Sequence, residues 1–235
     1  MTLEIEAGRI YGLIGPSGAR KPTLFNTITG VIPASTGTIT FEGRDITRLP
    51  PHVIARCGIS RTYQLVRPFA ELNAIENVKV GMFFGRSRDA APVDADADAE
   101  AEECLARVGL QGKAEATVGE LNLGERKRLE IAKSLAARPH LVLFDEVLAG
   151  LNPTEATAAV RLFQEICAAG TTILMIEHNM QAIMSACHYI FVLHHGELIG
   201  QGEPQAVARD PAVVEAYLGR RDLKLERRKR AVPHA

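Results

Sequence analysis

Short apolar runs recur along the chain and predict the strands of a parallel sheet. The run at 9–15, RIYGLIG, ends in glycine and leads into a short helical pattern that also closes at a glycine. The runs at 140–146 and 171–178 are apolar at nearly every position, as strands covered on both faces are. Residues 156–170 between them have the pattern of a crossover helix. We therefore expect an α/β fold with its chemistry at the carboxyl edge of a mostly parallel sheet.

Two alternating stretches predict antiparallel hairpins beside that sheet. The first, GTITFEGRDI, turns at Glu42 and Gly43. The second, YIFVLHHGELIGQG, turns at His195 and Gly196.

The middle of the chain differs from both flanks. Residues 65 to about 125 show no convincing strand and run through an acidic, alanine-rich stretch into an amphipathic helix, which indicates an inserted helical subdomain. We expect one domain over 1–219, with a core of 1–64 and about 126–219 around that insertion. The remaining residues, 220–235, form a basic tail. Such a tail is usually a solvated end, and weak contact with anionic lipid or nucleic acid is the alternative.

Composition excludes several classes of protein. The 235 residues are 46% hydrophobic and 23% charged with a net charge of -1, unlike a disordered chain or a basic nucleic-acid binder. The four cysteines are widely spaced and predict reduced thiols. No apolar run approaches the roughly 20 residues that span a bilayer. We expect a cytoplasmic protein that reaches a membrane only through a partner.

The segment GLIGPSGARKPTLFN has the position of a phosphate-binding loop between a strand and a helix. In the pattern G-x-x-x-x-G-K-[ST], Gly15 and Lys21 stand at the required separation. Arg20 replaces the second glycine, and Pro22 replaces the hydroxyl residue.

Both replacements impair such a loop. Pro22 lacks the hydroxyl that ligates Mg²⁺ and a backbone N–H, and we expect it to push Lys21 out of helical dihedral angles. Arg20 must adopt a glycine-type conformation, at about 1 to 3 kcal/mol, or distort the loop, although its charge partly offsets the loss of the metal. The sequence therefore predicts weak phosphate binding.

A longer constellation lies downstream. Residues 121–153 join a glycine-centred turn, a helix, a buried strand that ends at Asp145 and Glu146, and a further turn, and His178 ends the next strand. With these motifs the chain resembles the ATP-binding subunits of ABC transporters over about residues 1–219. Within that family it is most similar to the ATPases of branched-chain amino acid (Leu/Ile/Val-type) importers. The motifs that carry this similarity are RTYQ (61–64), AGLNP (149–153), IEHNM (176–180) and EAYLG (215–219).

The resemblance implies a RecA-like P-loop NTPase core with an antiparallel β subdomain and an inserted helical subdomain. It also implies that Asp145 holds Mg²⁺ directly or through water, that Glu146 polarises the attacking water, and that His178 contacts the γ-phosphate. Gln64 then reaches both the metal and the water. The residues assigned to ATP binding are Gly15, Pro16, Ser17, Gly18, Ala19, Arg20, Lys21, Pro22 and Thr23. The signature turn that acts on the other subunit's ATP is Leu121, Asn122, Leu123, Gly124 and Glu125. The D-loop is Ala149, Gly150, Leu151 and Asn152.

The chain departs from the family's pattern at further positions. Asn122 replaces the usual serine, although asparagine also caps helices. Val147 replaces the proline that usually follows the acidic pair. The family has an extra strand and an adenine-stacking aromatic residue before LEIEAGRI, and because the sequence begins at Met1 just ahead of that point, we expect the adenine platform to be missing.

The resemblance implies a cytoplasmic ATPase that lies on the inner face of the plasma membrane. Its partners are a second ATP-binding subunit, the same or different, two membrane permeases and, indirectly, a periplasmic substrate-binding protein, with no nucleic acid. The alternative is a catalytically impaired subunit that completes the ATP site of an intact homologue. A decayed or misread product is a third reading, because glycine to arginine and threonine to proline each need one base change.

Overall fold

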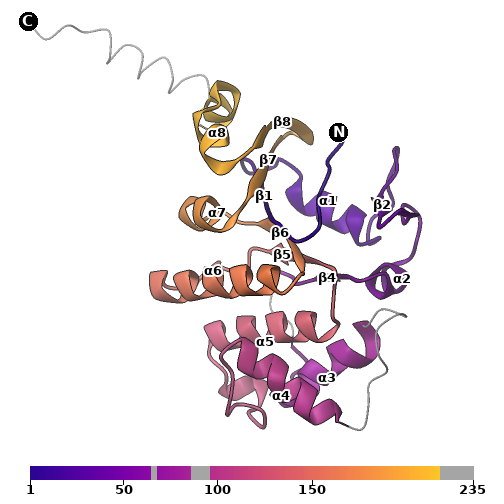
Figure 1. The fold of residues 1–235 in the computed structure, drawn as a ribbon, viewed down its shortest axis with the longest axis vertical. Coiled ribbons are helices and arrows are strands. Elements are labelled where there is room, and N and C mark those ends of the chain that lie inside the picture. Colours follow the sequence, from indigo (N-terminus) through magenta and orange to yellow (C-terminus); the bar gives the residue numbers. More distant parts are fainter. Residues whose placement is uncertain (65–67, 86–95, 218–235) are drawn as a thin grey trace, which may run out of the picture.

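The computed structural model describes residues 1–64, 68–85 and 96–217, and its centre is a six-stranded sheet (Figure 1). The strand order is β4-β5-β6-β1-β7-β8, and every neighbouring pair is parallel except β7 and β8. The strands are β1 Ile10–Ile14, β4 Ile59–Arg61, β5 Leu141–Asp145, β6 Thr172–Ile176, β7 Tyr189–His194 and β8 Glu197–Gly202. The predicted mostly parallel α/β fold is confirmed.

Alternate residues along the central strands face two different layers of helices. On one face Leu143 belongs to an apolar cluster with Phe25 of α1 (Lys21–Ile28) and Ile54 of α2 (Pro51–Arg56). On the other face Phe144 packs on Phe163 of α6, with ring centroids 4.7 Å apart. The helices on this second side include α6 Pro153–Ala168 and α7 Met180–Ala186. Because helices cover both faces, the central strands are apolar at nearly every position.

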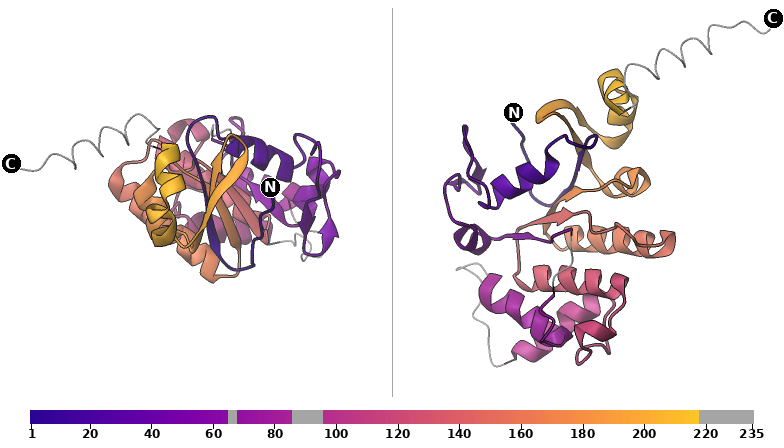
Figure 2. Two further views of the ribbon diagram at one scale, coloured as in Figure 1. Left: turned by 90° about the horizontal axis from the view of Figure 1, so that it is seen from above. Right: turned by 180° about the vertical axis from the view of Figure 1, so that it is seen from behind.

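The helical subdomain lies together on one side of the sheet in two views (Figures 1 and 2). It contains α3 Ala74–Gly85, α4 Ala97–Arg107, the short 3-10 helix η1 Val118–Glu120 and α5 Leu123–Ala136. Helices α3 and α5 approach closely at Gly81, where a Cβ would lie only 2.1 Å from the carbonyl oxygen of Lys133. The boundary predicted near residue 125 falls close to the start of α5, and α5 packs on α3 and α4.

Both predicted hairpins are present. Glu42 and Gly43 have φ of 48° and 76°, and they join β2 Thr40–Phe41 to β3 Arg44–Asp45. His195 and Gly196 have φ of 51° and 86° and join β7 to β8. Positive φ at both turn positions is the type I′ geometry that suits the twist of a hairpin.

The remaining parts add little to the sheet. Helix α8 (Pro204–Arg209) packs on β8, and a further helical segment follows at 211–217. Among the described residues, no helix is both long enough and apolar enough to cross a bilayer. The predicted tail at 220–235 lies outside the described residues.

Candidate functional site

The side chain of Lys21 is buried inside the loop that joins β1 to α1, where it hydrogen-bonds to the loop's own backbone. Lys21 is 4% exposed, and its Nζ donates to the carbonyl oxygens of Gly15 at 2.6 Å and Pro16 at 3.3 Å. Burial lowers the pKa of Lys21, and the negative charge of Glu146 opposes that shift. The ammonium group therefore lies inside the loop, where phosphate oxygens bind in a loop of this kind.

Arg20 takes up the conformation that glycine provides in the family's pattern. Its φ of 67° and ψ of 25° are left-handed, and it caps α1 with its carbonyl, which accepts from Leu24 N–H at 3.2 Å. The predicted displacement of Lys21 by Pro22 is wrong, because Lys21 is the first residue of α1. Proline fits the first helical turn, where the N–H has no partner within the helix. Helix α1 therefore begins at Lys21, but the loop lacks the N–H and the hydroxyl that a threonine at position 22 would supply.

Gly15 is required by close packing. Its φ is 152°, and a Cβ there would lie 2.1 Å from the carbonyl oxygen of Leu193 on β7. The loop also contacts the following hairpin, since Gly196 N–H donates to the Ala19 carbonyl at 3.2 Å. Its other glycine, Gly18, has φ of 81° and open space around it.

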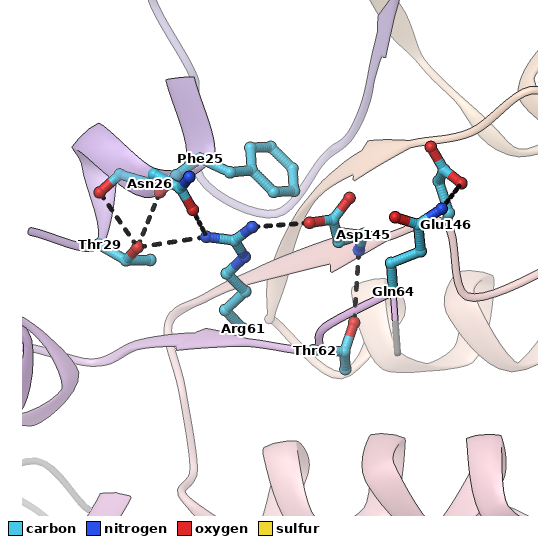
Figure 3. Close-up of polar contacts among 8 residues, drawn as sticks. All are labelled: Phe25, Asn26, Thr29, Arg61, Thr62, Gln64, Asp145 and Glu146. Carbon is cyan, nitrogen blue, oxygen red and sulfur yellow. Dashed lines mark hydrogen bonds and ion pairs between the residues drawn. The ribbon is translucent and has the colours of Figure 1, made fainter. Parts of the chain in front are cut away.

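Three predicted catalytic residues meet where β4, β5 and β6 end. The Gln64 Nε2 donates to Glu146 Oε2 at 2.6 Å, as Figure 3 shows. The His178 Nε2 lies 2.9 Å from the other carboxylate oxygen, Oε1. Glu146 has φ of 53°, a conformation that turns the chain sharply out of β5. The parallel strands thus bring a glutamine, a carboxylate and an imidazole from distant parts of the chain to one point.

Asp145, the predicted metal ligand, is buried beside this cluster. Its Oδ2 forms an ion pair with Arg61 Nη2 at 2.7 Å. Carboxylate and amide oxygens suit Mg²⁺, which usually takes one or two protein ligands and completes its shell with phosphate and water. Asp145 and Gln64 fit that donor set, whereas Pro22 adds nothing to it. Among the residues that the structure describes, no group of three or more His, Cys, Asp or Glu is placed to hold a metal ion by itself.

The predicted signature turn begins α5. Asn122 Oδ1 accepts from Glu125 N–H at 2.9 Å, and the Glu125 carboxylate accepts from Asn122 N–H at 2.9 Å, which is a capping box. Leu121 is buried and Leu123 is 53% exposed. A Cβ on Gly124 would lie 3.0 Å from the Glu155 Oε1 of α6, so this glycine packs against its own chain.

The predicted D-loop lies against the same helix. A Cβ on Gly150 would lie 3.3 Å from the Leu123 Cδ2, and Asn152 caps α6. The ammonium of Lys127 in α5 donates to the carbonyl oxygens of Val147 and Ala149. The structure therefore joins the signature helix to the D-loop within one chain.

Sequence reasoning missed four residues around the site. Glu177 Oε1 accepts from Leu148 N–H at 2.8 Å, and burial raises the pKa of this carboxyl to about 7. Burial also lowers the pKa of Lys127, against the attraction of Glu177 and Glu146. A charge at the end of an apolar run was the available signal for Glu177, and no local pattern marks Lys127.

Tyr217 and Arg61 are the other two residues near the site that sequence reasoning missed. Burial raises the pKa of Tyr217, and a hydrogen bond with the Gly15 backbone opposes the shift, so the C-terminal helical segment reaches the phosphate loop. Arg61 belongs to the RTYQ motif, but the sequence did not reveal its pairing with Asp145.

Comparisons with known proteins agree with this geometry. A family model described as ABC transporter matches residues 1–149, and one described as branched-chain amino acid ATP-binding cassette transporter matches residues 197–222. The high-affinity branched-chain amino acid transport ATP-binding protein LivG of Salmonella typhimurium is 38% identical over 230 residues, which cover 93% of this chain and 90% of that protein. The corresponding protein BraF of Pseudomonas aeruginosa is 36% identical, with the same coverage of 93% and 90%.

Solved structures give the same result. A nucleotide-free ATP-binding cassette from an ABC transporter superimposes with a TM-score of 0.83 at 31% identity, covering 92% of this chain and 90% of that chain. The ADP conformation of MJ1267, another such cassette, gives a TM-score of 0.81 at 32% identity, covering 91% and 89%. The chain therefore belongs to the ABC transporter family, as one of its ATP-binding cassettes.

Proposed function

We propose that this chain binds and hydrolyses ATP to drive a membrane transporter of branched-chain or related amino acids. The similarity to the branched-chain amino acid transport proteins LivG and BraF, together with the C-terminal family match, supports this substrate class. One observation carries the ATPase assignment. The phosphate loop, His178, Glu146 and Gln64 follow four strands that are neighbours in the sheet, β1, β6, β5 and β4, so all of them lie along one carboxyl edge.

In this proposal each residue of the site has a separate role in ATP hydrolysis. Lys21 releases the loop carbonyls and pairs with the phosphates, and the N-terminus of α1 adds its unpaired N–H groups. Glu146 polarises the attacking water, while Gln64 and His178 hold one carboxylate oxygen each and so fix its direction. Asp145 and Gln64 hold Mg²⁺, which when bound neutralises charge on the phosphoryl oxygens.

The proposed assembly places the chain on the cytoplasmic face of a membrane, as a peripheral subunit beneath two permeases. A second ATP-binding subunit supplies the signature turn across the dimer, and a periplasmic binding protein delivers the amino acid. The exposed Leu123 at the signature turn is consistent with such a contact.

A second candidate function is an impaired subunit that completes the ATP site of an intact homologue. The observation in its favour is Pro22, which deprives the loop of an N–H and a hydroxyl although the helix start is normal. Arg20 adds backbone strain of about 1 to 3 kcal/mol at the same loop.

Steady-state ATP turnover of the reconstituted transporter separates the two candidates. In a complex with the two permeases and an intact second cassette, Glu146→Gln in this chain is compared with the same change in the intact cassette. Loss of turnover from Glu146→Gln in this chain supports hydrolysis here. If turnover survives Glu146→Gln in this chain and is lost only when the intact cassette carries the change, the impaired-subunit function is supported. Uptake of labelled leucine, isoleucine and valine by vesicles that contain the reconstituted transporter tests the substrate class.

A further inference from the structure

Arg61 ends β4 and pairs in register with Leu143 of β5. Because side chains alternate along a strand, Arg61, Leu143 and Asp145 face the same side, which α1 covers. The Arg61 Nη2 donates to Asp145 Oδ2 at 2.7 Å, and the two side chains are only 6% and 8% exposed. Figure 3 shows the guanidinium between Asp145 and α1.

The same guanidinium holds α1. Its Nη1 donates to Asn26 Oδ1 at 2.7 Å and lies 3.5 Å from Thr29 Oγ1. Its central carbon lies 5.5 Å from the ring centroid of Phe25 and 4.8 Å from that of Tyr63. Since α1 begins at the end of the phosphate loop, one side chain connects that loop's helix to the acidic end of β5.

This arrangement is poorly explained as a stabilising contact alone. The cost of removing two charges from water offsets most of the attraction in a buried ion pair. The Arg61 Nε is also buried and makes no hydrogen bond with any residue in the described ranges. Apolar side chains in place of both members of the pair would avoid these costs, whereas replacing Arg61 alone would leave the buried carboxylate of Asp145 without its partner. What distinguishes the arginine is that its fork reaches Asp145 and Asn26 at once.

We propose that Arg61 is a positioning residue for Asp145. It fixes the carboxylate through Oδ2 and ties it to α1, which leaves Oδ1 for a cation that arrives with the nucleotide. Arg61 contacts neither nucleotide nor cation and acts through Asp145. This inference rests on the proposed ATP-binding function.

Calorimetry with ADP in Mg²⁺ and in excess EDTA tests the inference on the full chain. The readout is the ratio of the EDTA dissociation constant to the Mg²⁺ dissociation constant. One charge-assisted contact predicts a wild-type ratio of about tenfold. Arg61→Lys keeps the charge, but its single ammonium lacks the rigid fork that reaches both partners. We expect its ratio to fall to about one, with an EDTA dissociation constant within about twofold of wild type because the loop contacts do not use Arg61.

Two further variants and a control make the test specific. Asn26→Ala removes the shorter of the two hydrogen bonds from Arg61 to α1 and leaves the ion pair with Asp145, so we expect the ratio to fall. This variant serves as the test if Arg61→Lys does not fold. In an Asp145→Asn background, Arg61→Lys leaves the ratio unchanged, because both substitutions act on one carboxylate. Arg9→Lys, which alters an exposed pair with Glu6 at 3.0 Å, is the matched control and keeps the wild-type ratio.

The outcomes are distinct. The positioning role is overturned if Arg61→Lys shifts both dissociation constants together, if it changes only the melting temperature, or if the wild-type ratio is already one. Failure of the wild-type chain to bind ADP in either condition contradicts the proposed function itself, and the positioning role with it.

Discussion

Replacing Pro22 by threonine restores two groups to a loop whose backbone is already in place. Lys21 begins α1 and the Arg20 carbonyl already accepts the first helical hydrogen bond, so the substitution needs no rearrangement of the helix start. The regained N–H is one of the unpaired donors at a helix N-terminus, and the regained hydroxyl is a metal ligand in the family's pattern.

The N–H and the hydroxyl contribute separately to ADP affinity, and each contribution can be estimated. A hydrogen bond to a charged partner contributes about 1.5 to 3 kcal/mol, and about 1.4 kcal/mol corresponds to a tenfold change in affinity. Pro22→Ala regains only the N–H, so it should tighten ADP binding about tenfold or more both in Mg²⁺ and in EDTA. Pro22→Thr should match the alanine variant in EDTA and bind about tenfold more tightly than it in Mg²⁺.

Isothermal titration calorimetry on the full chain measures both variants. Pro51→Ala is the matched control, because Pro51 also lies in the first turn of a helix, α2, and should leave ADP affinity unchanged. Loss of a proline lowers the free energy of unfolding by up to about 1 kcal/mol through the unfolded state, which thermal denaturation reports separately. Equal Mg²⁺ affinities for the threonine and alanine variants would refute the metal-ligand role of residue 22.

Three further outcomes are expected. Glu146→Gln abolishes ATP turnover while the ADP dissociation constant stays within about threefold, since the amide keeps the shape and loses the basicity; unchanged turnover contradicts this role. Arg20→Gly combined with Pro22→Thr raises turnover more than the two single gains predict, because both residues shape one helical turn, and additive gains in a double-mutant cycle exclude this coupling. The pKa of Glu177 is about 7 in the folded protein, against an ordinary value of 4.5 for a glutamate. Between pH 4.5 and pH 7 the folded protein therefore binds more protons than the unfolded chain, and its free energy of unfolding falls as the pH rises through this range. Glu177→Gln, which leaves Lys127 and Glu146 nearby, removes this pH-dependent loss, which totals at most about 3 kcal/mol of the free energy of unfolding. Thermal denaturation from pH 5 to pH 8 measures it, and the same pH dependence in both proteins contradicts the shift.

Local patterns predicted the parts of the fold that local forces determine. The strands β1, β5 and β6 were visible because burial on both faces requires apolar runs, and the hairpins because their turns need residues that tolerate positive φ. Strand β4 was not, because three residues, Ile59–Arg61, are too short to show a period. The effect of Pro22 on Lys21 is not predictable from local pattern for a related reason: it depends on the exact residue at which α1 begins, which the sequence pattern leaves open.

In the site, too, local motifs predict some features, whereas others depend on how distant segments pair. Gln64, Glu146 and His178 were named from motifs, and the parallel strand order explains why they lie together. The pairing of Arg61 with Asp145 joins residues 84 positions apart and depends on the register of β4 against β5, which no single segment encodes.

Nucleotide binding at the phosphate loop is the most direct test of this account. Calorimetry of the full chain with ADP and Mg²⁺ should show one site per chain. Lys21→Ala should weaken binding at least about tenfold, because the ammonium that now closes the loop is the group that pairs with phosphate. Lys79→Ala, which removes a surface lysine paired with Asp98 at 2.6 Å, should leave the affinity unchanged. No detectable binding by the wild-type chain, or equal affinity in wild type and Lys21→Ala, would contradict the assignment of this loop as the ATP site.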